Sequence, residues 1–181
     1  HKIVDGQVNS YYNSRITNQP EPRLITTSCG ACNHPELSVD QIYGKHISRG
    51  KQLSHDELKK ALDEMRDGMK LFEATGGCHG AALLDSSGNV HFVSEDIGRH
   101  NAVDKTVGLA ILSGIKGFNG FTLLLSGRCG WDIVAKASRI GISNIASIGA
   151  FSSAALKLAR ENGISLYGFV RESGAWKVGI N

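Results

Sequence analysis

The sequence predicts an α/β fold built on a mixed β-sheet, with parallel βαβαβ units in its C-terminal half. Three observations predict it: strand and helix patterns alternate between 121 and 170, a hairpin pattern lies at 81–93, and an amphipathic helix pattern follows Ser54. With 181 residues, of which 41% are hydrophobic, the chain can bury one sizeable core. We expect one main α/β domain at 54–181, preceded by an N-terminal extension at 1–53.

The first helix has the clearest local signal. Ser54 followed by Glu57 forms a capping box, in which each residue satisfies a free backbone N–H at the start of the helix. Apolar side chains then recur on one helical face until Gly76 and Gly77 interrupt the pattern. We therefore predict one continuous helix up to these glycines. Its two methionines are expected to pack in the core.

A hairpin and a second helix follow. Two short apolar runs, 81–84 and 90–93, flank a cluster of turn residues at 85–89, which is typical of a β-hairpin. Asn101 is a candidate N-cap for a helix that continues to Ile115. Its buried face is expected to consist of Val103, Val107, Ala110 and Ile111.

The C-terminal elements alternate regularly. The predicted order is strand 121–125, helix 131–140, strand 142–148, helix 153–161 and strand 164–170. The two helices are expected to end at Gly141 and near Gly163. In parallel βαβ units the loops after the strands share one sheet edge, where ligands usually bind. These loops are 126–128, 149–152 and 171–174. Arg128, Arg171 and the free N–H groups at the start of helix 131–140 would favour a phosphorylated or nucleotide-containing ligand there.

Composition narrows the function classes. The net charge of +3 includes no basic tail, so nucleic acid is not an expected partner. No apolar run approaches the roughly 20 residues that a membrane span needs. Four cysteines are too few for a secreted disulfide scaffold, which favours a reducing cytoplasm. Because the chain begins at His1 without a signal-peptide pattern, we expect it to be part of a longer protein.

The most informative motif is the CxxC pair formed by Cys29 and Cys32. Such a pair can bind zinc, cycle between dithiol and disulfide, or carry sulfur as a persulfide. Zinc would need ligands from distant segments, such as Cys78 and Cys129, which we otherwise expect to be small buried residues. Thioredoxin-like exchange normally uses a motif that opens a helix, whereas Pro35 opposes a helix just after Cys32. Persulfide transfer needs only an accessible thiolate, and a loop at 33–53 would provide that access.

Several motifs together give the chain a resemblance to the FdhD/NarQ family of formate dehydrogenase accessory proteins. The matching segments are 27–32 (TSCGAC), 77–83 (GCHGAAL), 95–105 (EDIGRHNAVDK), 126–128 (SGR) and 168–171 (GFVR). The resemblance implies a sulfur carrier that accepts persulfide sulfur from a cysteine desulfurase. It would pass the sulfur to the molybdenum bis(molybdopterin guanine dinucleotide) cofactor of formate dehydrogenase. Cys29 would carry the persulfide and Cys32 would assist.

The resemblance also implies a cofactor-binding segment and a fold. The guanine nucleotide moiety would contact the segment formed by Phe169, Val170, Arg171, Glu172, Ser173 and Gly174. The fold would be a three-layer arrangement like that of cytidine deaminases, without a permanently bound metal, and a homodimer is expected. Deamination itself is not expected, because Ala81 stands where the catalytic glutamate of a His-x-Glu pair would be. The chain departs from the family pattern at Cys78, at Cys129 and in the acidic Glu172.

The family leaves two other interpretations of the thiols open. The protein could be a cofactor-binding chaperone with structural cysteines, or a thiol–disulfide oxidoreductase.

Overall fold

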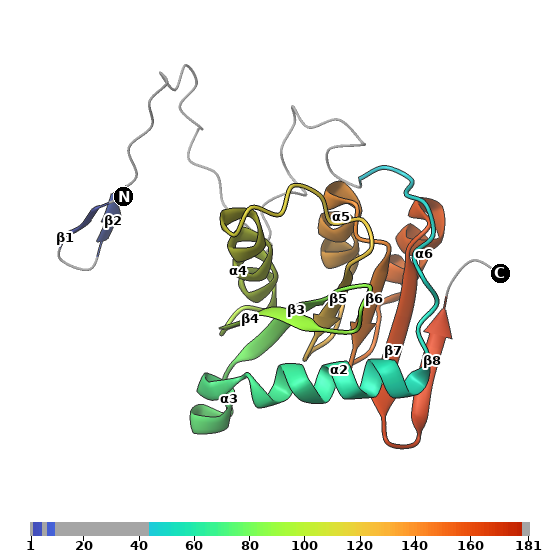
Figure 1. The fold of residues 1–181 in the computed structure, drawn as a ribbon, viewed down its shortest axis with the longest axis horizontal. Coiled ribbons are helices and arrows are strands. Elements are labelled where there is room, and N and C mark those ends of the chain that lie inside the picture. The colour runs from blue at the N-terminus through green and yellow to red at the C-terminus, as the bar shows by residue number, and fades with distance from the viewer. Residues whose placement is uncertain (1, 5–6, 10–43, 179–181) are drawn as a thin grey trace, which may run out of the picture.

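A computed structural model describes residues 2–4, 7–9 and 44–178. At its centre lies a six-stranded mixed sheet with the strand order β4-β3-β5-β6-β7-β8 (Figure 1). Strands β5 (Thr122–Leu125), β6 (Asn144–Ser147) and β7 (Ser165–Arg171) run parallel to one another. Strand β3 (His79–Leu84) pairs antiparallel with both β4 (Val90–Asp96) and β5, and β8 (Gly174–Val178) pairs antiparallel with β7. The predicted α/β fold with a mixed sheet and C-terminal parallel units is confirmed.

Helices cover both faces of the sheet and give the fold three layers. Strand residues alternate between two cores: Leu83, Leu123 and Leu166 pack on one face, while Leu84 and Leu124 pack on the other. The first core is covered by α4 (Arg99–Leu112), α5 (Trp131–Ile140) and α6 (Ser153–Asn162). The second core is covered by α2 (His55–Asp67).

The first helix differs from the prediction, because the expected continuous helix is broken in two. The capping box of Ser54 and Glu57 is present, but α2 ends at Gly68 and a short helix, α3 (Lys70–Thr75), follows. A Cβ atom at Gly68 would lie 3.2 Å from both methyl groups of Val93, so the helix end packs closely against β4. The break leaves Met69 buried and turned toward Gly80 of β3.

The helix predicted to start at Asn101 starts earlier. Gly98 is its N-cap, and Asn101 lies within α4, where its Nδ2 donates to Asp96 Oδ1 at 3.1 Å. Ile111, expected on the buried face, is 56% exposed. Val103 and Ala110 are buried as predicted, and Ala102 is buried beside them. By contrast, α5 and α6 end at Gly141 and Gly163 as predicted, with φ angles of 87° and 76°.

Two further segments complete the described chain. Strands β1 (Lys2–Val4) and β2 (Gln7–Asn9) form a separate antiparallel pair. Residues 44–53 have no regular structure, but Ser138 Oγ donates to Lys45 O at 2.7 Å and Asn144 Nδ2 donates to Lys51 O at 2.9 Å. The end of the predicted N-terminal extension is therefore fastened to the main domain by hydrogen bonds. Within the described residues, the helices are too short or too polar to cross a membrane.

Candidate functional site

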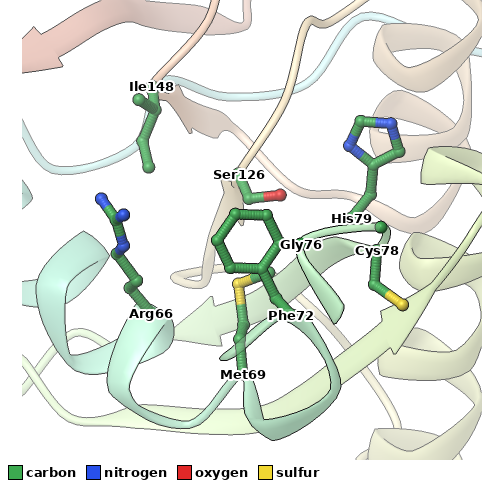
Figure 2. A pocket seen from close by; sticks show the side chains of 9 residues that line it. Arg66, Met69, Phe72, Gly76, Cys78, His79, Ser126 and Ile148 are labelled. Carbon is green, nitrogen blue, oxygen red and sulfur yellow. The ribbon is translucent and has the colours of Figure 1, made fainter. Parts of the chain in front are cut away.

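A pocket of about 340 Å³ opens at the carboxyl end of the parallel strands, the edge at which the sequence predicts a ligand site. Ser126 follows β5, Ile148 follows β6, and His79 begins β3, which runs antiparallel to β5 and so brings its first residue to the same edge. Figure 2 shows these side chains around the pocket. The nine lining residues are Arg66, Met69, Phe72, Gly76, Gly77, Cys78, His79, Ser126 and Ile148.

Close packing of the backbone shapes the pocket walls. The Gly80 N–H donates to Ser126 Oγ at 2.7 Å, and the Ser126 N–H donates to Gly80 O at 3.0 Å, which extends the pairing of β3 and β5 to the pocket. A Cβ atom on Gly80 would overlap the side chain of Met69, and one on Gly127 would lie 2.9 Å from His79 Nδ1. Glycine is therefore needed at both positions to let the lining side chains lie where they do.

Cationic and aromatic groups give the pocket its chemical character. The guanidinium of Arg66 lies 6.0 Å from the centroid of the Phe72 ring, within cation–π range. Arg128 is exposed in the loop that follows Ser126. An aromatic face beside positive charge suits a planar, anionic ligand better than a neutral apolar one.

The amino end of α5 is less open to phosphate than the sequence predicts. The carboxylate of Asp132, in the first turn, lies over Gly130, the N-cap residue, and also pairs with the buried ring of His100. A carboxylate at a helix N-terminus already neutralises the partial positive charge that would attract an anion. The ring of His100 is thus buried and hydrogen-bonded to the first turn of α5.

The structure brings two of the three predicted loops together. The Cys129 N–H donates to Ala150 O at 3.0 Å, which joins the loop after β5 to the loop after β6. The Phe169 N–H donates to Gly149 O at 3.2 Å and links this pair of loops to β7. At Gly149 the two loops touch so closely that a Cβ atom would lie 2.9 Å from the backbone nitrogen of Arg128.

The predicted cofactor-binding segment 169–174 lies beside this edge, but it does not contribute to the nine residues that line the pocket. Phe169 is 41% exposed and has a φ of 50°, and Arg171 Cζ lies 5.9 Å from the centroid of its ring. Val170 is buried in the core under α2, so its side chain faces away from solvent. Its role in binding a cofactor, like that of the other residues in the segment, stays a prediction.

The rest of the segment turns toward α2. Arg171 and Gly174 are paired across the β7–β8 turn, and Ser173 lies between them on the exposed side. Glu172 Oε1 lies 2.7 Å from Lys59 Nζ, so an α2 lysine neutralises the acidic charge that the family pattern did not anticipate.

The two CxxC cysteines, Cys29 and Cys32, lie outside the described residues. Of the other two, Cys129 is buried as predicted, and its burial, with the nearby Asp132 carboxylate, raises the pKa of its thiol. Cys78 was predicted to be buried, which is wrong: it is only partly buried, in the pocket wall. Within the part of the chain that the structure describes, no three histidine, cysteine or acidic residues are placed to hold a metal ion.

Sequence reasoning missed Arg66, Phe72 and Glu95. Arg66 lies in the last turn of α2, and Phe72 lies on α3, beyond the break at Gly68; both line the pocket. Glu95 belongs to the matching segment 95–105, but no role was predicted for it. Its two carboxylate oxygens accept hydrogen bonds from backbone N–H groups of α3.

Comparison with known proteins supports the resemblance. Residues 4–176 match the model of the FdhD/NarQ family. Proteins named "Sulfur carrier protein FdhD" include one from Picrophilus torridus, 40% identical over 82% of this chain and 57% of its own length. Another, from Sulfurisphaera tokodaii, is 32% identical over 92% of this chain and 64% of its own length. The chain thus spans about three fifths of these relatives.

A solved structure shares the fold. It is a crystal structure described as a formate dehydrogenase accessory protein from Desulfotalea psychrophila. It aligns with a TM-score of 0.68 at 30% sequence identity, over 77% of this chain and 59% of the other.

Proposed function

The chain belongs to the FdhD/NarQ family, and on this premise we propose that it is a sulfur carrier needed for formate dehydrogenase activity. In this role it accepts persulfide sulfur from a cysteine desulfurase and transfers it to the molybdenum bis(molybdopterin guanine dinucleotide) cofactor. The observation that carries the proposal is the family match, which includes the CxxC motif of Cys29 and Cys32.

The transfer onto the protein is a thiol exchange. The Cys29 thiolate attacks the outer sulfur of the desulfurase persulfide, a new S–S bond forms on Cys29, and the desulfurase cysteine leaves as its thiolate. No oxidant or reductant is consumed, because one persulfide replaces another. This makes the protein a sulfurtransferase with a cysteine persulfide intermediate. When no acceptor is present, the Cys32 thiolate attacks the inner sulfur of the Cys29 persulfide, which forms a Cys29–Cys32 disulfide and releases hydrosulfide.

The cofactor is the substrate of the second transfer, and the strand edge is the proposed place where it binds. A pocket of about 340 Å³ is at the lower end of the usual range for small-molecule sites. It suits one planar part of the cofactor beside Phe72 and Arg66, and the rest would extend along the open edge. Arg128 and Arg171 supply positive charge there for the phosphates.

The partners follow from this chemistry. A cysteine desulfurase donates the sulfur, and formate dehydrogenase receives the sulfurated cofactor. We place the reaction in the cytoplasm, where thiols stay reduced. A homodimer is the expected assembly, since symmetric pairs are the commonest oligomers.

Mass spectrometry after incubation with a cysteine desulfurase and cysteine tests the carrier role. We expect one added sulfur on the peptide that holds Cys29, absent in Cys29→Ala and retained in Cys78→Ala, the matched control for an accessible thiol. Sulfur on Cys78 alone would overturn the assignment of Cys29. Bound zinc without added sulfur would favour the chaperone with structural cysteines, and a Cys29–Cys32 disulfide without persulfide would favour the oxidoreductase.

GDP titration tests the cofactor site. We expect Arg66→Ala to weaken GDP binding about tenfold or more, and Arg171→Ala to do the same if segment 169–174 holds the phosphates. Arg160→Ala is the matched control, because it removes an equal charge from the last turn of α6. Unchanged affinity in Arg66→Ala would remove the pocket from the proposal, and unchanged affinity in Arg171→Ala would remove the segment.

A further inference from the structure

One wall of the pocket is the short helix α3, and little within the helix itself fixes its position. It has six residues, and its N-cap, Met69, provides no side-chain hydrogen bond to the first free N–H groups. Yet Met69 and Phe72 both line the pocket. The orientation of this helix therefore determines where the Phe72 ring lies.

The hydrogen-bond acceptor that caps the N-terminus of α3 comes from strand β4. Glu95, near the end of β4, accepts hydrogen bonds from the backbone N–H groups of Leu71 at 2.8 Å and Phe72 at 2.7 Å, one with each carboxylate oxygen. Two hydrogen bonds to one carboxylate fix both its distance and its direction. The Phe72 backbone is thus fastened directly to β4.

A β-bulge lets Glu95 reach α3. Ala81 pairs with Ser94, but Leu83 pairs with His91, so β4 has one extra residue in this interval. Phe92, within the bulge, has a φ of 55°, in the left-handed region that non-glycine residues rarely adopt. Because strand side chains alternate, one extra residue moves every later side chain to the opposite face. Glu95 consequently lies opposite Gly80, on the face that carries Met69.

The backbone of Glu95 is also held from the other side. Lys105 Nζ, from α4, donates to Glu95 O at 2.5 Å. The neighbouring Asp96 accepts from the Gly98 N–H at 2.9 Å and from Asn101 Nδ2 at 3.1 Å. The segment 95–105 thus connects the first turn of α4 to the pocket wall.

We infer that Glu95 is a positioning residue: the bulge at Phe92 directs it onto α3, where it fixes Phe72 for ligand binding. The inference rests on the proposed function only in its last step, the binding of ligand beside Phe72. The capping of α3 by Glu95 is a separate claim, and it can be measured without any ligand.

The experiment compares Glu95→Gln and Glu95→Asp with the wild-type chain by hydrogen–deuterium exchange and GDP titration. Glutamine keeps the size but offers one acceptor where two are needed, and aspartate keeps the charge but is shorter. We expect exchange of the 70–76 amides to accelerate about tenfold or more in Glu95→Gln, and GDP affinity to fall by a similar factor. In Glu95→Asp both effects should be smaller. Glu73→Gln is the matched control, because Glu73 lies on the same helix and forms an exposed ion pair with Lys70.

The two readouts separate the possible failures. Unchanged exchange at 70–76 in both Glu95 variants would overturn the capping role of Glu95. Faster exchange there with unchanged GDP affinity would keep the cap but overturn the positioning role and the pocket as the nucleotide site. Faster exchange throughout β5 and β6 in both variants would show that Glu95 supports the whole fold, which also overturns the inference.

Discussion

Substitution of Gly149 by alanine tests whether the proposed ligand-binding edge depends on direct backbone contact between two loops. In Gly149→Ala the new Cβ would lie 2.9 Å from Arg128 N, 3.0 Å from Gly127 C and 3.1 Å from Arg128 Cα. Ordinary contacts are about 3.5 Å or longer, so the loops must separate by about half an ångström. Backbone atoms cannot rotate away as a flexible side chain can.

The change in the free energy of unfolding can be estimated as the sum of three contributions. Overpacking of this kind costs about 1–3 kcal/mol. Separation of the loops also strains the Cys129–Ala150 and Phe169–Gly149 hydrogen bonds, each worth about 1 kcal/mol. Alanine recovers about 0.4–1 kcal/mol by restricting the unfolded chain. We expect the free energy of unfolding to fall by about 1–3 kcal/mol, and the Tm by about 2–4 °C for each kcal/mol.

Urea unfolding provides the assay, and Gly108→Ala is the matched control. Gly108 lies within α4, and a Cβ atom there meets nothing within 4 Å. Alanine should therefore raise the free energy of unfolding by up to about 1 kcal/mol through helix propensity. The same chemical change should thus have opposite signs at the two positions. A neutral or stabilising Gly149→Ala, with Gly108→Ala stabilising as expected, would refute the close approach of the loops.

Two further predictions concern titratable groups. Alkylation of the folded protein with iodoacetamide should modify Cys78 at least about tenfold faster than Cys129, because the Cys129 thiol is buried and has a raised pKa. Equal rates of modification, measured by peptide mapping, would contradict this prediction. Burial alone would raise the pKa of Asp85, but hydrogen bonds from Asn89, His91 and Ser87 outweigh it and lower that pKa to about 2. Because this folded-state pKa lies below the ordinary value of 3.8, the stability that Asp85 contributes is present above about pH 4 and is lost as the pH falls toward 2. Urea unfolding between these pH values should therefore show a shallower pH dependence for Asp85→Asn than for the wild-type chain, and identical dependences would refute the role of Asp85.

The sequence was most informative where structure depends on near neighbours. Ser54, Gly141 and Gly163 mark helix ends through the chemistry of their own caps, and short continuous apolar runs identified strands buried on both faces. The break at Gly68 has only a weak local signal, because a single glycine is tolerated within a helix pattern; in the fold Gly68 packs against Val93 of β4. The apolar period continues through Met69 and Phe72 and conceals the break.

The sheet edge at which the pocket lies was predictable from the sequence, but the residues that form and support its walls were not. Parallel strand order brings Ser126 and Ile148 to one edge whatever their neighbours are. Glu95 could not be placed, because a single extra residue in β4 determines which face of the sheet it occupies. Strand periodicity alone would place it on the opposite face.

The core under α2 also determines the order in which the chain can fold as it is synthesised. Leu58 and Met65 of α2 pack in the same cluster as Tyr167 and Val170 of β7, and the Leu53 N–H donates to the Tyr167 hydroxyl, 114 positions later in the sequence. At ribosomal rates of about 5–20 residues per second, roughly 5–20 s pass between the emergence of α2 and that of β7. During this interval the apolar face of α2 lacks part of its native cover. This helix face therefore needs protection from aggregation until β7 is in place.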